Sequence, residues 1–357
     1  MHILILIKES DPMETSIRAF LEECDYFQGL QVMNDTSTFG SFTYSMLSAF
    51  HDELGKTSTV IFPLITDSIH NQQDLSEASL SRRVVSDALY LRGINNELST
   101  YTSIIPIQAP STWRNSRSSS LLAIDDTNYH TSALLSAHIE NSTILLRTKR
   151  NRETIPAFSS SLNPHGLHRF GGLSGVLPLY PNSIDEDAIS HLCDFSTTGK
   201  PRHLEPTYFS RRDVTRALSL PSLQPFDGLV TTQIKINNAM STNPMLPPLP
   251  LPSSFPNIFA DHTILDHEAR RRAGGMNGNV GIFSSLSATA GTGTLFADYA
   301  RFVSKCVEQR RGSALTHGLV DDLDDLRELA NDLWTIRDGY DDVEVEEPST
   351  DGGEDDD

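Results

Sequence analysis

The chain has 357 residues, more than a typical single domain, and a formal net charge of −19. Most of this charge lies in residues 321–357, which hold 17 acidic and 2 basic residues, and this balance argues against nucleic acid as a partner. The three cysteines are far apart, which argues against a disulfide framework or a cysteine zinc site, and no apolar run is long enough to span a membrane.

The first residues do not predict a signal peptide. The apolar run from Ile3 to Ile7 is short, and neither a basic region nor a small-residue cleavage site accompanies it. Together with the separated cysteines, this pattern indicates an intracellular, reducing compartment.

Residues 29–107 alternate between strand-like and helix-like segments. Strands are expected at 29–33, at 58–65 and near 101–107, and helices at about 38–54 and 75–91. The expected core positions of the two helices follow helical spacing: Phe39, Phe42, Met46, Leu47, Phe50 and Leu54, then Leu80, Val84, Ala88 and Leu91. This order predicts an α/β fold with a parallel sheet and crossover helices.

The turn between the first strand and helix, residues 34–41, has two interpretations. A loop before a helix can hold phosphate through its backbone N–H groups and the helix dipole. The contacts would then be Thr36, Ser37, Thr38, Gly40 and Ser41. This loop, however, has a single glycine, and Asp35 adds a negative charge. The sequence therefore favours a turn and N-cap for the helix.

The middle of the chain is rich in turn-forming residues. Residues 110–120 predict a surface loop and 128–146 predict a helix. Residues 151–187 hold many Ser, Pro and Gly residues and predict a linker between two domains, 1–150 and 188–310.

Two histidines in this linker have the spacing of metal ligands on a helix. They are His165 and His168, but Pro164 and Gly166 favour a loop, and no third ligand is suggested nearby. The sequence therefore predicts no metal site.

The proline-rich segment 244–256 favours extended polyproline geometry. It can dock on an aromatic groove of a partner or lie across its own domain as a rigid connector. Its interleaved Leu and Phe residues favour the connector.

The last third predicts a strand at 280–289, a tight turn at 290–294 and a helix at 295–306. The Gly-Thr-Gly-Thr turn lacks the lysine and the glycines of a Walker loop, which favours a structural role. Residues 311–340 predict a C-terminal helix, with a near-heptad stripe of Leu319, Leu323, Leu326, Ala330, Leu333 and Arg337. Residues 341–357 predict a disordered acidic tail.

Three motifs carry a family resemblance. They are Phe-Leu-Glu-Glu-Cys-Asp-Tyr-Phe-Gln-Gly-Leu-Gln at 20–31, Tyr-His-Thr-Ser-Ala-Leu-Leu at 129–135, and Leu-Pro-Leu-Pro-Ser-Ser-Phe-Pro-Asn-Ile-Phe at 249–259. Over most of its length the chain resembles the Misato family of tubulin-like proteins, associated with mitochondrial distribution, morphology and inheritance. The resemblance implies a partial nucleotide-binding-type sheet, a second α/β domain and C-terminal helices. Family members begin with a further amino-terminal portion that holds the first strands of this domain, and the resemblance implies either that this chain lacks that portion or that its start site is misassigned.

The resemblance also bears on nucleotide binding. The glycine-rich phosphate loop of tubulins is replaced here by residues 34–41, and residues 147–158 hold no counterpart of the acidic loop that activates water in tubulins. In contrast, Asp126-Thr-Asn128 matches a tubulin motif that contacts guanine, although a helix cap is the simpler interpretation.

We therefore expect a noncatalytic protein without a cofactor that acts through protein contacts, with cytoskeletal or mitochondrial-surface partners. Its expected locations are the cytoplasm and the outer face of the mitochondrion. The alternative is a degenerate GTPase that still binds guanine nucleotide through residues 36–41 and Asn128.

Overall fold

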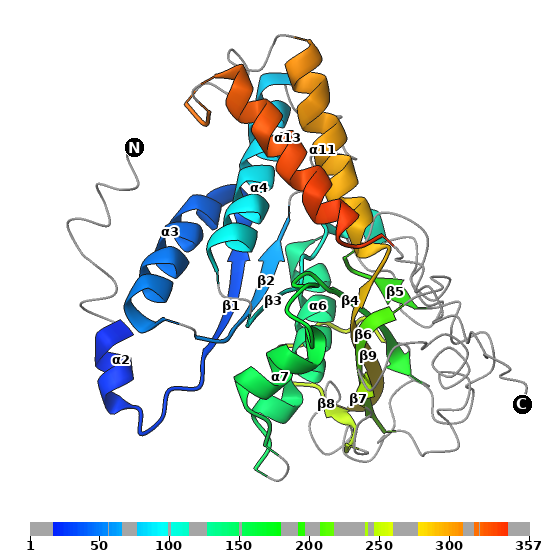
Figure 1. Cartoon of the computed structure of the whole chain (residues 1–357). Coiled ribbons are helices and arrows are strands. Elements are labelled where there is room, and N and C mark those ends of the chain that lie inside the picture. Colours follow the sequence, from blue (N-terminus) through cyan, green and yellow to red (C-terminus); the bar gives the residue numbers. More distant parts are fainter. Residues whose placement is uncertain are drawn as a thin grey trace, which may run out of the picture.

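The computed structural model describes residues 17–55, 57–65, 77–98, 101–113, 127–149, 152–179, 192–196, 208–217, 240–241, 246–259, 278–309, 318–320 and 322–341 (Figure 1). The predicted acidic tail lies outside these residues, apart from Asp341.

The first sheet is parallel and has the order β1 (Leu30–Asp35), β2 (Thr59–Leu64) and β3 (Thr102–Ile104). Helices α3 (Thr36–Leu54) and α4 (Glu77–Glu97) connect these strands and pack against each other. The predicted parallel α/β arrangement is therefore confirmed. A short helix, α2 (Arg18–Glu23), precedes β1 and has no buried residue.

The core stripe predicted for α3 is partly wrong. Leu47 and Phe50 are buried as expected, but Phe39 is 56% exposed. The buried stripe is Thr36, Gly40, Thr43, Leu47 and Phe50. The small residues in it let α3 approach α4 closely, because the ring of Tyr90 lies over Gly40.

The second sheet is mostly antiparallel and is built around the long strand β9 (Asn279–Thr289). Its order is β5 (Cys193–Asp194), β4 (Gly172–Leu179), β9, β6 (Tyr208–Arg216) and β7 (Met240–Ser241). Strand β8 (Leu249–Pro250) also pairs with β9.

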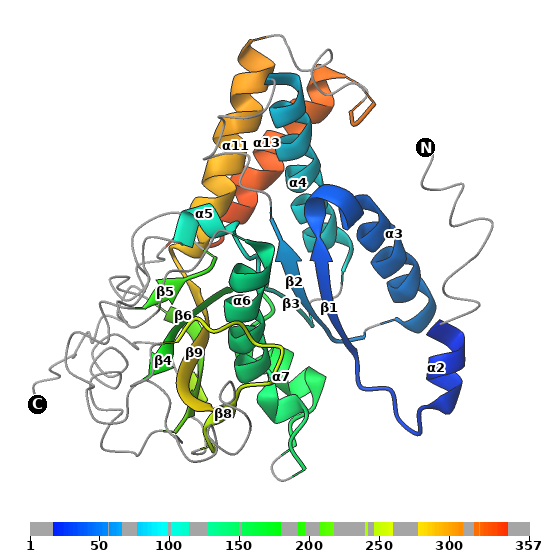
Figure 2. The same cartoon turned by 180° about the vertical axis from the view of Figure 1, so that it is seen from behind.

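Two helices lie between the sheets. Helix α6 (Asn128–Ser142) packs on β4, β6 and β9, and the turn η3 (Ile144–Leu146) follows it (Figure 2). Helix α7 (Ile155–Leu162) contacts β6 and also β2 and β3. A common core therefore joins the two sheets.

Segments predicted as loops or linkers contribute to this core. Residues 151–187, expected to be a linker, contain α7 and the fully buried strand β4. Part of the loop predicted at 110–120 is the short helix α5 (Pro110–Trp113), whose Trp113 ring is buried against Phe195. The proline-rich segment packs on its own domain as expected, with Leu249 and Leu251 buried.

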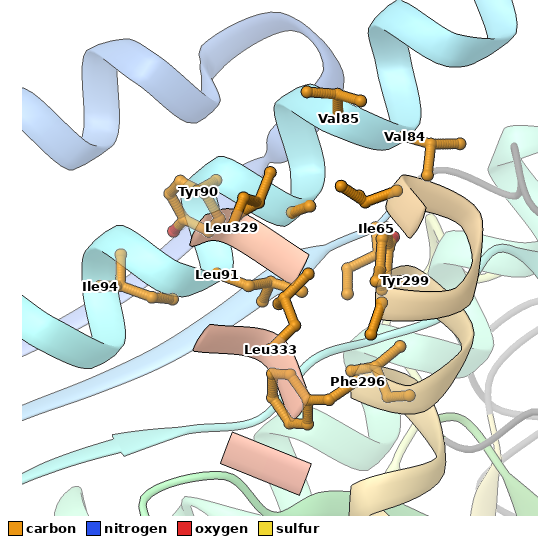
Figure 3. Packing of buried hydrophobic residues seen from close by; sticks show 14 of the residues in the cluster. Ile65, Val84, Val85, Tyr90, Leu91, Ile94, Phe296, Tyr299, Leu329 and Leu333 are labelled. Carbon is orange, nitrogen blue, oxygen red and sulfur yellow. The ribbon is translucent and has the colours of Figure 1, made fainter. Parts of the chain in front are cut away.

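The C-terminal helices α11 (Thr292–Glu308) and α13 (Leu323–Asp338) pack on each other and on α4. Figure 3 shows their side chains meeting in one apolar cluster, which includes Leu91, Phe296, Tyr299, Leu329 and Leu333. Leu329 was missing from the predicted stripe. Helix α13 begins after Asp322, whose side chain forms a capping box with Asp325, so it covers only the later part of the predicted range 311–340.

In the described part of the chain, no helix has both the length and the apolarity that crossing a bilayer requires.

Candidate functional site

The junction of β1 and α3 is where a phosphate would bind if the chain held a nucleotide. β1 ends at Asp35 and α3 begins at Thr36, so no loop residue lies between strand and helix. Asp35 is the N-cap residue. One of its carboxylate oxygens accepts hydrogen bonds from the Ser37 backbone N–H at 3.1 Å and the Ser37 hydroxyl at 2.9 Å. The carboxylate therefore occupies the helix N-terminus, where a phosphate would be attracted.

Two of the other predicted contacts in this turn, Thr36 and Gly40, also have structural partners. The buried Thr36 hydroxyl donates to the Leu64 carbonyl oxygen at 3.1 Å, which ties α3 to the end of β2. A Cβ atom at Gly40 would lie 3.7 Å from the Tyr90 ring, so this glycine faces α4 and lies within the helix. Thr38 and Ser41 are exposed. The geometry matches the N-cap interpretation of the sequence.

Tyr90 of α4 packs beside the junction of β1 and α3. Its hydroxyl donates to Asn34 Oδ1 at 3.0 Å, and burial raises the pKa of Tyr90 above its ordinary value of 10.0. The tyrosine therefore stays neutral and serves as a hydrogen-bond donor between α4 and β1.

Replacing Asp35 with alanine is expected to lower the free energy of unfolding by about 1 kcal/mol, because the first turn of α3 loses its cap. Asp35→Asn keeps an accepting oxygen and should cost much less. Urea unfolding of both variants measures the difference. Equal losses in the two variants would show that the charge of Asp35, and not its hydrogen bond, stabilises α3.

Asn128, the predicted guanine contact, is the first residue of α6 and is exposed. The N-cap residue is Thr127, so the helix-cap interpretation is wrong for Asn128, and Asp126 lies outside the described residues. No hydrogen bond links Asn128 to residues 36–41 within the described ranges. The two halves of the predicted site lie on helices that pack on different sheets, since α3 contacts β1 and α6 contacts β4, β6 and β9.

A cleft of about 780 Å³ lies between α3, α4 and α13. Of the predicted site residues, only Ser41 lines it. Its charged lining has both signs: Arg82, Arg92 and Glu97 from α4, and Asp325, Glu328 and Asp332 from α13. Arg92 and Asp332 form an ion pair across it at 3.4 Å. No sequence motif predicted this cleft, because Arg92 of α4 and Asp332 of α13, which face each other across it, are 240 residues apart in the chain.

The remaining candidates have structural roles. The His168 ring stacks on Phe209 with centroids 3.9 Å apart, and its Nε2 lies 3.1 Å from the Gly339 carbonyl oxygen. Within the described residues, no group of three or more His, Cys, Asp or Glu side chains could hold a metal ion. The Gly-Thr-Gly-Thr turn begins α11, and a Cβ atom at Gly293 would lie 3.2 Å from the Tyr340 Cβ, so a neighbouring residue covers that helix end.

Comparison with known proteins agrees with this fold. Residues 4–148 match the family model described as a tubulin domain. The chain is 28% identical over 195 residues to the protein dml-1 of Neurospora crassa, which covers 53% of this chain and 34% of the relative. It is 30% identical over 159 residues to the protein misato of Drosophila melanogaster, which covers 42% of this chain and 27% of the relative.

Over part of its length the chain is similar to the Misato and Dml1 proteins, and its residues 4–148 are similar to a tubulin domain. A longer match, 23% identical over 359 residues, joins 94% of this chain to 66% of the protein dml1 of Aspergillus clavatus. The chain spans about a third of the length of the first relatives that it matches. The tubulin-domain match ends two residues after η3, so it contains the whole first sheet and α6.

Proposed function

We propose that this protein is a noncatalytic, tubulin-like scaffold that acts in mitochondrial distribution, morphology and inheritance through protein contacts. The observation that carries the noncatalytic part is the Asp35 carboxylate, which caps α3 in the position that a phosphate would need. A bound phosphate would have to displace this cap and approach a negative charge. The mitochondrial role rests on the resemblance to the Misato family.

The cleft between α3, α4 and α13 is the proposed contact surface. Its basic side chains come from α4 and most of its acidic ones from α13, so a partner with complementary charges can be oriented by it. The partner would lie on the cytoskeleton or on the outer face of the mitochondrion, and the protein would be found there and in the cytoplasm.

Charge reversal on one wall of the cleft tests the proposal in cells that make this protein. Arg82 and Arg83 are neighbouring exposed residues of α4, but only Arg82 lines the cleft. Arg82→Glu, replacing the native protein, is expected to disturb mitochondrial distribution, whereas Arg83→Glu should not. The readout is the fraction of daughter cells that receive normal mitochondria, at equal protein abundance.

Asn128→Ala serves as the second arm of this experiment. A scaffold that needs no nucleotide should keep normal mitochondrial distribution with this variant. Normal distribution with Arg82→Glu, together with a defect with Asn128→Ala, would contradict the scaffold and favour a nucleotide-dependent role.

The alternative function, a degenerate GTPase that binds guanine nucleotide, is favoured by one feature. The Asn128 side chain is exposed at the start of α6, and within the described residues its amide group forms no hydrogen bond with another side chain. It is therefore open to a ligand. The phosphates of the nucleotide could bind at the N-terminus of α3 only after the Asp35 carboxylate had left its capping position, which makes this the weaker proposal.

A further inference from the structure

A group of exposed basic residues lies in the connection between η3 and α7. Its members are Arg147, Lys149 and Arg152, which we call the basic segment. Arg150, between them, lies outside the described residues. Within the part of the chain that the structure describes, none of the three forms an ion pair. The segment therefore concentrates uncompensated positive charge in a chain whose net charge is −19.

The acidic residues nearest to this segment in the sequence do not neutralise it. The two carboxylate oxygens of Glu153 accept hydrogen bonds from Arg212 of β6 at 2.9 and 2.6 Å. The Oε1 atom of Glu140 lies 4.0 Å from Nη1 of Arg216, which also belongs to β6. Because both carboxylates pair with arginines of the second sheet, the charge of the basic segment is available to an external partner.

The basic segment is anchored at its first residue. The Nη2 group of Arg147 donates to the Glu140 carbonyl oxygen at 3.0 Å, near the C-terminus of α6. A positive charge is favourable at this end of a helix, so Arg147 has a structural role. The side chains of Lys149 and Arg152 form no hydrogen bond with the described residues. These two can therefore contact a partner without loss to the fold.

The chemistry of the segment fits a layer of anionic lipid headgroups. A protein interface needs an apolar centre, and surfaces that bind single-stranded nucleic acid use exposed aromatic rings. In the described part of residues 144–157, no large apolar side chain is exposed. Lysine and arginine side chains beside an anionic bilayer, in contrast, are attracted by charge alone. The basic segment supplies this charge and none of the other features.

The basic segment and the acidic helix α13 occupy different parts of the molecule. Figures 1 and 2 show α7, which follows the segment, in the lower half of both views and α13 in the upper half. Salt screens charges that are far apart, so the two regions act largely independently. We infer that the basic segment binds the surface of an anionic membrane, with Lys149 and Arg152 as its main contacts. This surface is separate from the cleft, and the inference does not rest on the mitochondrial role.

Cosedimentation of the full chain with lipid vesicles tests this assignment. Each basic residue beside an anionic surface strengthens binding about fivefold. The chain should therefore bind vesicles of phosphatidylcholine with about 30% phosphatidylserine about 100-fold more strongly than vesicles of phosphatidylcholine alone. Raising the salt concentration from about 0.05 M to about 0.5 M should remove most of this difference. Equal binding to both kinds of vesicle at low salt would overturn the inference.

Paired variants locate the contact. Lys149→Gln combined with Arg152→Gln should weaken binding to the anionic vesicles about 25-fold, because two charges are lost. Lys149→Arg combined with Arg152→Lys keeps both charges and should bind like the native chain. The matched control is Arg83→Gln combined with Lys305→Gln, which removes two exposed charges from α4 and α11. Its binding should stay within about twofold of the native value.

Two other outcomes would overturn the membrane assignment. An equal loss in the control pair would show that net charge, and not the basic segment, determines binding. Polyglutamate serves as the probe for an acidic protein partner. Saturable binding of polyglutamate that requires Lys149 and Arg152, without binding to vesicles, would assign the segment to such a partner. Thermal unfolding midpoints equal to that of the native chain verify that each variant is folded.

Discussion

Replacement of Glu153 by alanine is expected to lower the free energy of unfolding by about 3–5 kcal/mol. Its two carboxylate oxygens accept hydrogen bonds from Arg212 at 2.9 and 2.6 Å. The Arg212 side chain is 3% exposed, and its guanidinium lies 4.5 Å from the centre of the Phe158 ring. Without Glu153 a buried positive charge in β6 would lose its partner.

An exposed ion pair provides the comparison for this variant. Arg327 and Asp324 pair on the surface of α13, so Asp324→Ala should cost less than about 1 kcal/mol. Urea unfolding of both variants gives the two losses. A loss for Glu153→Ala as small as that for Asp324→Ala would mean that water reaches Arg212 and that the ion pair does not join the segment before α7 to β6.

Stability is expected to fall in mild acid because of His138. This side chain is 2% exposed between α6 and the second sheet, with its Nδ1 2.9 Å from the Ser284 hydroxyl, and burial lowers its pKa from 6.5 to about 3. The unfolded chain therefore binds a proton that the folded chain does not. The stability is fully present above pH 6.5 and is lost as the pH falls toward 3, with about 2 kcal/mol lost at pH 5.

The measurement is the urea midpoint between pH 7.5 and 5 for the native chain and for His138→Gln. The native midpoint should fall with pH, and the variant should lose this part of the slope while being less stable at pH 7.5. His165→Gln is the control, because His165 is exposed and should keep the native slope. An unchanged slope in His138→Gln would assign the acid loss to carboxylates.

The sequence predicts the first sheet well because its elements are locally consistent. The strand at β2 is a continuous buried run, and the buried residues of α4 recur at helical spacing. In each element the apolar pattern therefore specifies both the type of secondary structure and the face that is buried. In contrast, β4 was missed because its glycines resemble turn residues. A Cβ atom at Gly175 would lie 2.4 Å from the Phe283 carbonyl oxygen and 2.5 Å from the His138 ring. This glycine permits close packing and does not mark a turn.

The candidate site was predictable only in part. The N-cap at Asp35 depends on neighbouring residues, and the sequence indicated it. The cleft depends on how α13 returns to α4, which no local pattern encodes. The ion pair of Arg212 and Glu153 was not predicted for the same reason, since 59 residues separate its members.

Titration of the full chain with GTP and Mg²⁺ separates a noncatalytic scaffold from a degenerate GTPase. We predict no saturable binding up to about 1 mM GTP, because Asp35 caps the helix at the phosphate position and Asn128 begins a helix that packs on the second sheet. Saturable binding of GTP that ATP does not displace, and that Asn128→Ala weakens, would contradict this account and show that the turn at residues 34–41 still holds a nucleotide.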